Sequence, residues 1–297
     1  MQISEIGLNA REKLIDILSV GFSQRSPQQW SQFLNRIATA MTGKNLPETA
    51  VGQGPRIGWL LGSPESPDGI LLGLPNPLSG LTDRNQPQGI NMSSWFVKEE
   101  KRAQAIWMLR KISNLAGHTF TDLSPSAVVA RMLPSLGYSP ICQGITRVYT
   151  PQAVMAAKGG WQVVAADAAI AKQSDPQFVQ ALQDHRALGC LVLGLERNGR
   201  CLPLVVKTGQ SWRRGLHAEV IYLPAPDAET PNPRRAIPAL ARALLGRGVL
   251  QLDIERPLDD RLNTPMLQRL VSDRPRFAKG PYPVGGISHL YSELAYA

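Results

Sequence analysis

The chain has 297 residues, enough for two domains of about 150 residues each. Hydrophobic residues make up 43% of it and charged residues 19%, which excludes a disordered or fibrous chain and predicts a substantial buried core. The net charge of +9 favours an anionic ligand, with a nucleic acid or a plain solvated basic surface as the alternatives.

Features that would indicate secretion, a membrane or a metal are not found. The first residues lack the basic start and unbroken apolar stretch of a signal peptide, and no window reaches the roughly 20 apolar residues of a membrane span. The cysteines Cys142, Cys190 and Cys201 are odd in number and lack C-x-x-C spacing. We therefore expect a cytoplasmic protein with no disulfide framework, no bound metal and no membrane partner.

The first 45 residues are predicted to be helical. Apolar residues recur at helical spacing over 10–20 and 27–41, and Ser26 and Pro27 suit the N-cap and first position of the second helix. Short strands are expected at 56–62 and 69–74.

The next stretch carries most of the information. Its pattern predicts a strand, a charged turn, a helix, a second strand and a second helix that ends at Gly137. These elements are expected at 90–97, 98–102, 103–116, 118–123 and 127–136.

The second half repeats this order. Asn198-Gly199 predicts a hairpin between strands at 188–195 and 200–207. A strand at 216–223, a helix at 236–245 and a strand at 249–254 follow. Asp122 and Asp253 each lie in a short strand directly after a helix that ends at glycine, so we interpret the chain as an internal duplication.

Residues 91–138 resemble the cofactor-binding core of the GNAT (N-acetyltransferase) superfamily. Val97, Arg102 and Ala105 match its pattern of a valine, four residues, an arginine or glutamine, and a small residue three positions later. The resemblance implies acetyl-CoA or another acyl-CoA as co-substrate, with its pyrophosphate held by backbone N–H groups at a helix N-terminus. The cofactor-binding residues that it implies are Phe96, Val97, Arg102, Ala103, Gln104 and Ala105.

Two positions depart from the family pattern. Trp107 stands where a second small residue is usual, and Leu133 stands where many members carry a tyrosine general acid. Tyr138 takes the place of the terminal aromatic residue.

The phrases NMSSWFVKEEKR and TDLSP resemble a group of bacterial tandem-GNAT acyltransferases, and HLYSELAYA resembles the last strand of that group. This resemblance implies an α/β protein with mixed (α+β) sheets, built from two tandem GNAT-like domains at residues 1–150 and 151–297. The first is expected to hold the acyl-CoA site. The second is expected to be degenerate, because prolines crowd the turn before its helix between positions 224 and 233.

In this fold the acceptor attacks the thioester directly, so the protein has to orient it, remove a proton and stabilise an oxyanion. Ser94 and Asp122 are the predicted catalytic residues, with Ser93 and Ser124 as neighbours; a cap or turn role is the alternative for Asp122 and Ser124. Because successive strand residues face opposite ways, at most one of Ser93 and Ser94 is expected to reach the cleft.

Two further pairs share one strand face by their spacing: His217 with Glu219, and Tyr291 with Glu293. The first pair is a candidate base with its partner, and an exposed polar strand face is the alternative.

The predicted function is acyl transfer from acyl-CoA to an amine or hydroxyl on a small-molecule or peptide acceptor. Nucleic acid is not the expected partner, but an aminoacyl-tRNA-dependent transferase stays open as an alternative because of the basic charge. A non-catalytic binding or regulatory protein is the other alternative, favoured by Trp107 and Leu133. The oligomeric state does not follow from the sequence.

Overall fold

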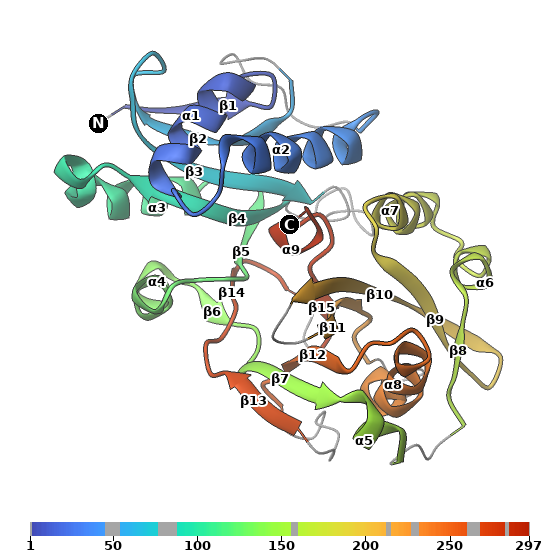
Figure 1. Ribbon diagram of the computed structural model, residues 1–297. Coiled ribbons are helices and arrows are strands. Elements are labelled where there is room, and N and C mark those ends of the chain that lie inside the picture. Colours follow the sequence, from blue (N-terminus) through green and yellow to red (C-terminus); the bar gives the residue numbers. More distant parts are fainter. Residues whose placement is uncertain are drawn as a thin grey trace.

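A computed structural model of the chain describes residues 2–44, 54–76, 88–155, 160–211, 215–226, 232–259, 268–282 and 285–296. The described part forms two mixed sheets with helices on their faces (Figure 1). None of its helices is both long enough and apolar enough to cross a bilayer.

The first sheet is mostly antiparallel and contains one parallel pair, β4 and β5. Its strand order is β1-β2-β3-β4-β5-β14-β6. The strands are β1 (Ile3–Gly7), β2 (Arg56–Gly62), β3 (Pro67–Asn76), β4 (Gln88–Val97), β5 (His118–Asp122), β6 (Ser139–Pro140) and β14 (Phe277–Lys279).

Helices cover both faces of this sheet. On one face, α1 (Arg11–Gly21) and α2 (Pro27–Met41) bury an apolar stripe that includes Leu14, Trp30 and Leu34. On the other face lie the 3-10 helix η1 (Glu99–Gln104), α3 (Ala105–Ser113), α4 (Ala127–Met132) and the 3-10 helix η2 (Leu133–Leu136).

The second sheet has the order β13-β7-β12-β11-β10-β9-β8, and β15 pairs with β11. Its strands are β7 (Gly144–Tyr149), β8 (Gln162–Val164), β9 (Leu191–Arg197), β10 (Arg200–Ser211), β11 (Gly215–Leu223), β12 (Gln251–Arg256), β13 (Gln268–Ser272) and β15 (Ile287–Ser288). The helical elements of this half are α5 (Thr150–Met155), α6 (Ala166–Ala171), α7 (Pro176–Ala187), η3 (Pro233–Ala236), α8 (Ile237–Leu245) and the terminal α9 (Glu293–Tyr296).

The two halves share the same strand–helix–strand unit. In each, a strand leads through a 3-10 helix into an α-helix and then into a parallel strand: β4-η1-α3-β5 and β11-η3-α8-β12. Both β4 and β11 also carry a bulge two residues after their last parallel pairing, at Ser94 and Ile221. The chain therefore has two α/β domains of the same type, as the sequence predicts.

Late in the chain, the backbone crosses from the second sheet to the first and back again. Strand β14, which follows β13 of the second sheet in sequence, inserts between β5 and β6 of the first sheet. The C-terminal residues then return to the second sheet at β15 and end at α9, which lies between the two sheets in Figure 1.

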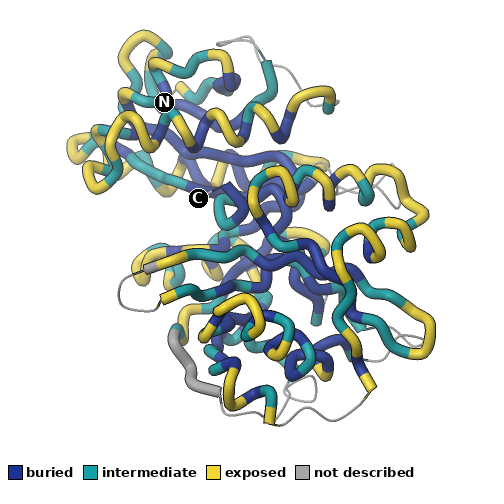
Figure 2. Tube along the Cα trace, turned by 45° about the vertical axis from the view of Figure 1, so that its right-hand side comes forward, coloured by how far each residue is buried: buried dark blue, intermediate teal, exposed yellow. Residues whose placement is uncertain are grey.

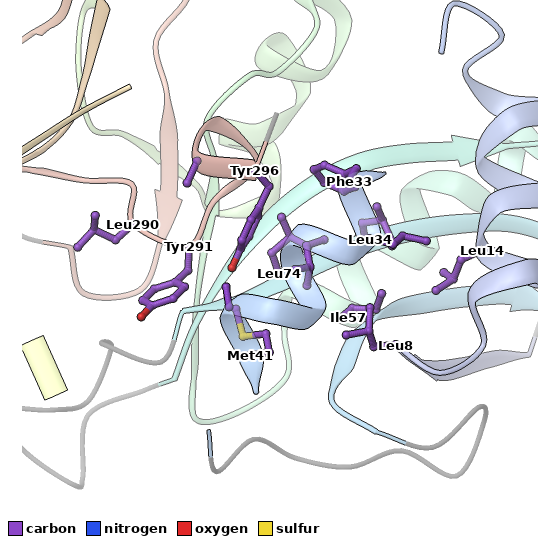
Figure 3. Close-up of a cluster of buried hydrophobic side chains, with 14 of the residues drawn as sticks. Leu8, Leu14, Phe33, Leu34, Met41, Ile57, Leu74, Leu290, Tyr291 and Tyr296 are labelled. Carbon is purple, nitrogen blue, oxygen red and sulfur yellow. The ribbon is translucent and has the colours of Figure 1, made fainter. Parts of the chain in front are cut away.

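One hydrophobic core spans both halves. It joins α1, α2 and the first sheet to Leu182, Val205 and Ile221 of the second half, and to Tyr291 and Tyr296 near the C-terminus. The buried stretches run continuously through this region in Figure 2, and Figure 3 shows the two tyrosines beside Met41 and Leu74. The C-terminal segment is therefore part of the core between the sheets.

The helices at 10–20 and 27–41 are confirmed, and Ser26 forms a full capping box with Gln29. The Asn198-Gly199 hairpin is also confirmed, with positive φ at both residues. Two predictions were wrong. Residues 3–7 form the edge strand β1, paired with β2, and the C-terminal segment ends in the helix α9 where a last strand was expected.

A cluster of buried charges lies in the second half. Glu255 is 2% exposed, and its carboxylate accepts from His289 Nε2 at 2.7 Å and from Arg276 Nη1 at 3.2 Å. Arg276 also pairs with Glu219 at 2.5 Å, and Arg234 donates to the carbonyl of Glu255 at 2.6 Å. Burial disfavours the ionised carboxylate, but His289 and the arginines outweigh it and hold the pKa of Glu255 at about 2.

This cluster predicts acid-dependent stability. Because the pKa of Glu255 is lower in the folded protein than its ordinary value of 4.5, the stabilisation is complete above about pH 4.5 and is lost as the pH falls toward 2. Glu255→Gln is expected to lower the free energy of unfolding at pH 7 by about 3 kcal/mol, because Arg276 keeps a buried charge with one partner fewer. Urea unfolding at several pH values measures both effects.

The exposed Glu100→Gln serves as the control and should change neither quantity. An unchanged slope of stability against pH below 4.5 in Glu255→Gln would contradict the assignment.

Candidate functional site

The site begins where β4 and β5 separate. The parallel pairing ends at Met92 opposite Asp122, while β4 continues to Val97 without β5 beside it. The edge of β4 from Ser93 onward therefore faces an opening in the sheet, at the carboxyl ends of two parallel strands. Such a point in an open α/β sheet is a common place for a ligand.

A bulge in β4 lies at this opening. Leu71 of β3 pairs with Trp95 and Leu72 pairs with Ser93, so Ser94 is the extra residue. A bulge bends its strand and leaves the extra residue out of the ladder. As a result both Ser93 and Ser94 line the opening, which corrects the expectation that only one of them would.

The opening holds a pocket of about 240 Å³. Its polar lining comes from Ser93 and Ser94 of β4, Asp122 at the end of β5, the loop 124–126, and Glu293 of α9. None of the described residues that line it is basic. Its apolar lining comes from both faces of the sheet: Phe22, Leu71, Met92, Trp95, Leu109 and Val129.

Glu293 reaches the pocket from the end of the chain. Its two carboxylate oxygens accept hydrogen bonds from the hydroxyls of Ser93 and Ser124. The expectation that Tyr291 and Glu293 share a strand face was wrong, because this segment is a turn followed by α9. Glu293 comes from beyond the second sheet and completes a pocket in the first.

Asp122 is the titrating group of the site. Its side chain retains some solvent contact but is surrounded largely by protein. Burial, with a smaller contribution from the Glu293 carboxylate, raises the pKa of Asp122 to about 7. The backbone N–H of Ser124, at 3.3 Å from Oδ1, opposes this shift only in part. Near neutral pH the carboxyl group is therefore poised to exchange a proton.

The pyrophosphate was expected to bind free backbone N–H groups at the helix N-terminus after β4. The structure of this segment is different. The 3-10 helix η1 continues directly into α3, and the N–H of Ala105 donates to the carbonyl of Arg102. The first turn of this combined helix carries Glu99 and Glu100. The N–H groups of α3 are thus partly satisfied within the helix, and acidic side chains stand at its start.

The six predicted cofactor residues lie at the end of β4, in η1 and at the start of α3, and all are outside the pocket lining. Phe96 packs against Gly21, and Val97 is buried in the core below α3. Ala105 packs against the same core, while Ala103 and Arg102 are exposed. Arg102 is 73% exposed and forms an ion pair with Glu99 at 3.9 Å. Gln104 is the N-cap residue of α3, and its side chain makes no capping hydrogen bond. Binding of phosphates at this loop would therefore depend on side chains and not on backbone N–H groups alone.

Trp107 points outward. It is 60% exposed, and the Arg110 guanidinium lies 6.0 Å from its ring. The bulky residue therefore does not enter the core. Leu133 is fully buried in that core, and Tyr138 is buried with its hydroxyl on the Met92 sulfur at 3.3 Å. Burial raises the pKa of Tyr138 well above its ordinary value, so this phenol is a poor proton donor.

The second half fills the equivalent opening with its own chain. Beyond its last parallel pairing, β11 bonds β15 at Tyr222 and Leu223, and the carbonyl of the bulge residue Ile221 accepts from the N–H of His289 at 2.8 Å. Glu219 pairs with Arg276, and the one hydrogen bond described for His217 is with the carbonyl of Gly215 at 3.5 Å. His217 and Glu219 therefore do not form a pair. Positions 227–231 of the proline-rich turn lie outside the described residues.

The sequence signals explain which site residues could be found. Ser94 and Asp122 belong to the stretch that resembles GNAT proteins, and the structure brings both to one pocket. Phe22 carries no local motif, and Glu293 lies in HLYSELAYA, whose pattern predicted a strand with no link to the pocket. Only the spatial arrangement identifies them.

Comparisons with known proteins concern the fold. No protein-family model matches the sequence, and no curated protein is significantly similar to it. Among solved structures, a candidate acetyltransferase from Pyrococcus horikoshii superposes with a TM-score of 0.54 at 15% identity, covering 100% of this chain and 95% of that one. Its overlap with this chain extends over both sheets.

Two other structures give lower scores. A GCN5-related N-acetyltransferase from Kribbella flavida has a TM-score of 0.49 at 10% identity, covering 94% of this chain and 71% of its own. One from Sphaerobacter thermophilus has a TM-score of 0.47 at 11% identity, covering 95% and 96%.

The carboxyl pair yields a prediction about titration. Glu293→Gln removes the neighbouring negative charge and should shift the pKa of Asp122 downward from about 7, with burial still holding it above the ordinary 3.8. Carboxyl-carbon NMR of ¹³C-labelled protein measures it. A midpoint that stays at the wild-type value would show that Glu293 does not act on Asp122.

Proposed function

We propose that this chain, which has the fold of the GCN5-related N-acetyltransferases, transfers an acyl group to an amine or hydroxyl acceptor in the pocket between β4 and β5. The observation that carries the proposal is the position of Asp122, with a pKa raised to about 7, beside Glu293 in a pocket with apolar walls. A general base works best when its pKa lies near the working pH.

Asp122 takes the role of general base. At pH 7 about half of the Asp122 carboxyl groups are ionised, which follows from a pKa of about 7. The carboxylate accepts the proton that the acceptor nitrogen or oxygen loses as its bond to the acyl carbon forms. Burial and, to a smaller extent, the charge of Glu293 keep Asp122 basic. Glu293 also holds the Ser93 and Ser124 hydroxyls in place.

The bulge at Ser94 supplies hydrogen-bond donors that could stabilise the oxyanion. Donors directed at the place where negative charge develops lower the barrier most when they are fixed beforehand. Ser94 is the residue left out of the β3–β4 ladder, and β5 no longer covers this part of β4. Its N–H and hydroxyl are therefore the donors that we assign to the carbonyl oxygen of the acyl group.

The donor is an activated acyl compound, with acyl-CoA as the first choice. After the acceptor has bonded to the acyl carbon, the bond from that carbon to the thiol sulfur breaks, and the leaving thiolate takes the proton that Asp122 accepted. The apolar residues Met92, Trp95 and Leu109 surround the acyl end. Lys98, Lys101 and Arg102 of the loop and η1 are the side chains available for its phosphates.

Asp122→Asn tests the base. We expect kcat/KM for acyl transfer to fall by about 10²- to 10⁴-fold, because an amide cannot accept the proton. In the wild type, kcat/KM should rise with pH through about 7 and then level off, since the deprotonated carboxylate is the active form. Release of free thiol from a panel of acyl-CoAs, with amines and alcohols as acceptors, measures the rate.

The exposed Asp167→Asn, in the second half, is the matched control and should retain wild-type activity. Full activity in Asp122→Asn, with an unchanged pH profile, would remove Asp122 from the reaction.

Arg102→Glu tests the predicted donor site. Reversing this exposed charge should raise the Kd of acyl-CoA at least several-fold, because the variant adds a third acid beside Glu99 and Glu100. Calorimetric titration measures it, with Arg242→Glu on α8 as a control of equal charge change. Equal affinity in both variants would place the phosphates elsewhere.

A second candidate uses a donor carried on RNA, as in aminoacyl-tRNA-dependent transferases. The outward face of η1 and α3 favours it, because Arg102, Trp107, Arg110 and Lys111 are all exposed there. Cations beside an exposed aromatic ring are typical of surfaces that bind single-stranded nucleic acid. Salt-sensitive tRNA binding without acyl-CoA binding would favour this candidate, and absence of both would favour the non-catalytic alternative.

A further inference from the structure

The last described residues form a strap between the two halves, defined here as His289–Tyr296. At its start, His289 bonds Glu255 at 2.7 Å in the charge cluster of the second half. At its end, the carbonyl of Tyr296 accepts from Arg36 of α2 at 3.0 Å. The strap is thus attached to both halves, and α9 lies between them in Figure 1.

The peptide groups on either side of Tyr291 are held from opposite sides. Its N–H donates to His185 Nε2 of α7 at 3.0 Å, and its carbonyl accepts from Asn91 Nδ2 of β4 at 3.5 Å. Tyr291 has a φ of +56°, in the left-handed region that side chains other than glycine rarely adopt. A conformation of this kind persists only when surrounding contacts hold it.

His185 is fixed as an acceptor. Its Nδ1 lies 2.8 Å from the carbonyl of Ala181 and therefore carries the proton, which leaves Nε2 free to accept from Tyr291. The side chain is fully buried, and its ring lies edge-on to the Tyr291 ring at 4.7 Å. Burial lowers the pKa of His185 to about 4, so the ring stays neutral at physiological pH.

Glu293 follows Tyr291 by two residues, and its carboxylate accepts hydrogen bonds from Ser93 and Ser124. We infer that His185 is a positioning residue: by holding the turn at Tyr291, it directs Glu293 of the strap into the pocket of the first half. The second half thereby contributes to a site that it does not contain. The inference rests on the proposed function only for its effect on the rate, because the placement of Glu293 has its own readout.

The test pairs two substitutions of His185. His185→Phe keeps an aromatic ring beside Tyr291 but removes the acceptor, whereas His185→Gln restores an oxygen close to the position of Nε2. We expect the titration midpoint of Asp122, measured by carboxyl-carbon NMR, to fall below the wild-type value in the Phe variant and to return toward it in the Gln variant. If acyl transfer is found, kcat should fall about tenfold in the Phe variant with the donor KM unchanged.

Leu240→Ala on α8 controls for lost stability, because it removes core packing in the second half away from the strap. It should lower the melting temperature without moving the Asp122 midpoint. Combining His185→Phe with Glu293→Gln should shift the midpoint no further than Glu293→Gln alone.

A wild-type midpoint in His185→Phe, or an equal shift in Leu240→Ala, would overturn the inference. A protein without acyl transfer would refute the proposed function, and the titration would still decide the role of His185.

Discussion

Burial of the C-terminal strap between the two sheets is the interaction on which the rest of the structure depends. Leu290, Tyr291, Ala295 and Tyr296 are all buried in the core that joins the halves. Each large side chain buried in this way contributes about 1.5–3 kcal/mol, which exceeds the cost of about 1–2 kcal/mol for holding Tyr291 in the left-handed region. The turn and the helix α9 therefore exist because the core requires the tyrosines there, and Glu293 is carried into the first pocket as a result.

The same unit has two outcomes in the two halves. Both β4 and β11 bulge and part from their parallel neighbours. In the second half, β15 and His289 occupy the gap, and the buried Glu255 is compensated by Arg276 and His289, so the opening becomes part of the core. In the first half, the segment from β15 to α9 contributes the Glu293 side chain to the opening, and a pocket remains. The segment from β15 to α9 thus closes the opening in the second sheet and contributes a carboxylate to the opening in the first.

The sequence allowed the local features to be predicted. Ser26 and Pro27 predict the start of α2, and Asn198-Gly199 predicts a hairpin. The stretch from β4 to β5 carries the resemblance to GNAT proteins. Features set by distant contacts could not be predicted. The alternation in HLYSELAYA suits a strand, but packing against α2 and α7 imposes a turn and a helix. Likewise, the bulge that lets Ser93 and Ser94 share one pocket depends on pairing with β3, which local alternation does not report.

The pocket also explains how a carboxyl group keeps an unusual pKa in so basic a protein. The chain carries a net charge of +9, yet no described residue lining the pocket is basic. A lysine or arginine there would pair with Asp122 and lower its pKa, which would make it a weak base at neutral pH. Placing Glu293 at that point has the opposite effect, and it leaves the carboxyl pair without a counter-charge of its own. Under the proposed function, an acceptor that enters in its neutral form would leave this pKa raised, and Asp122 would be the adjacent group suited to take its proton.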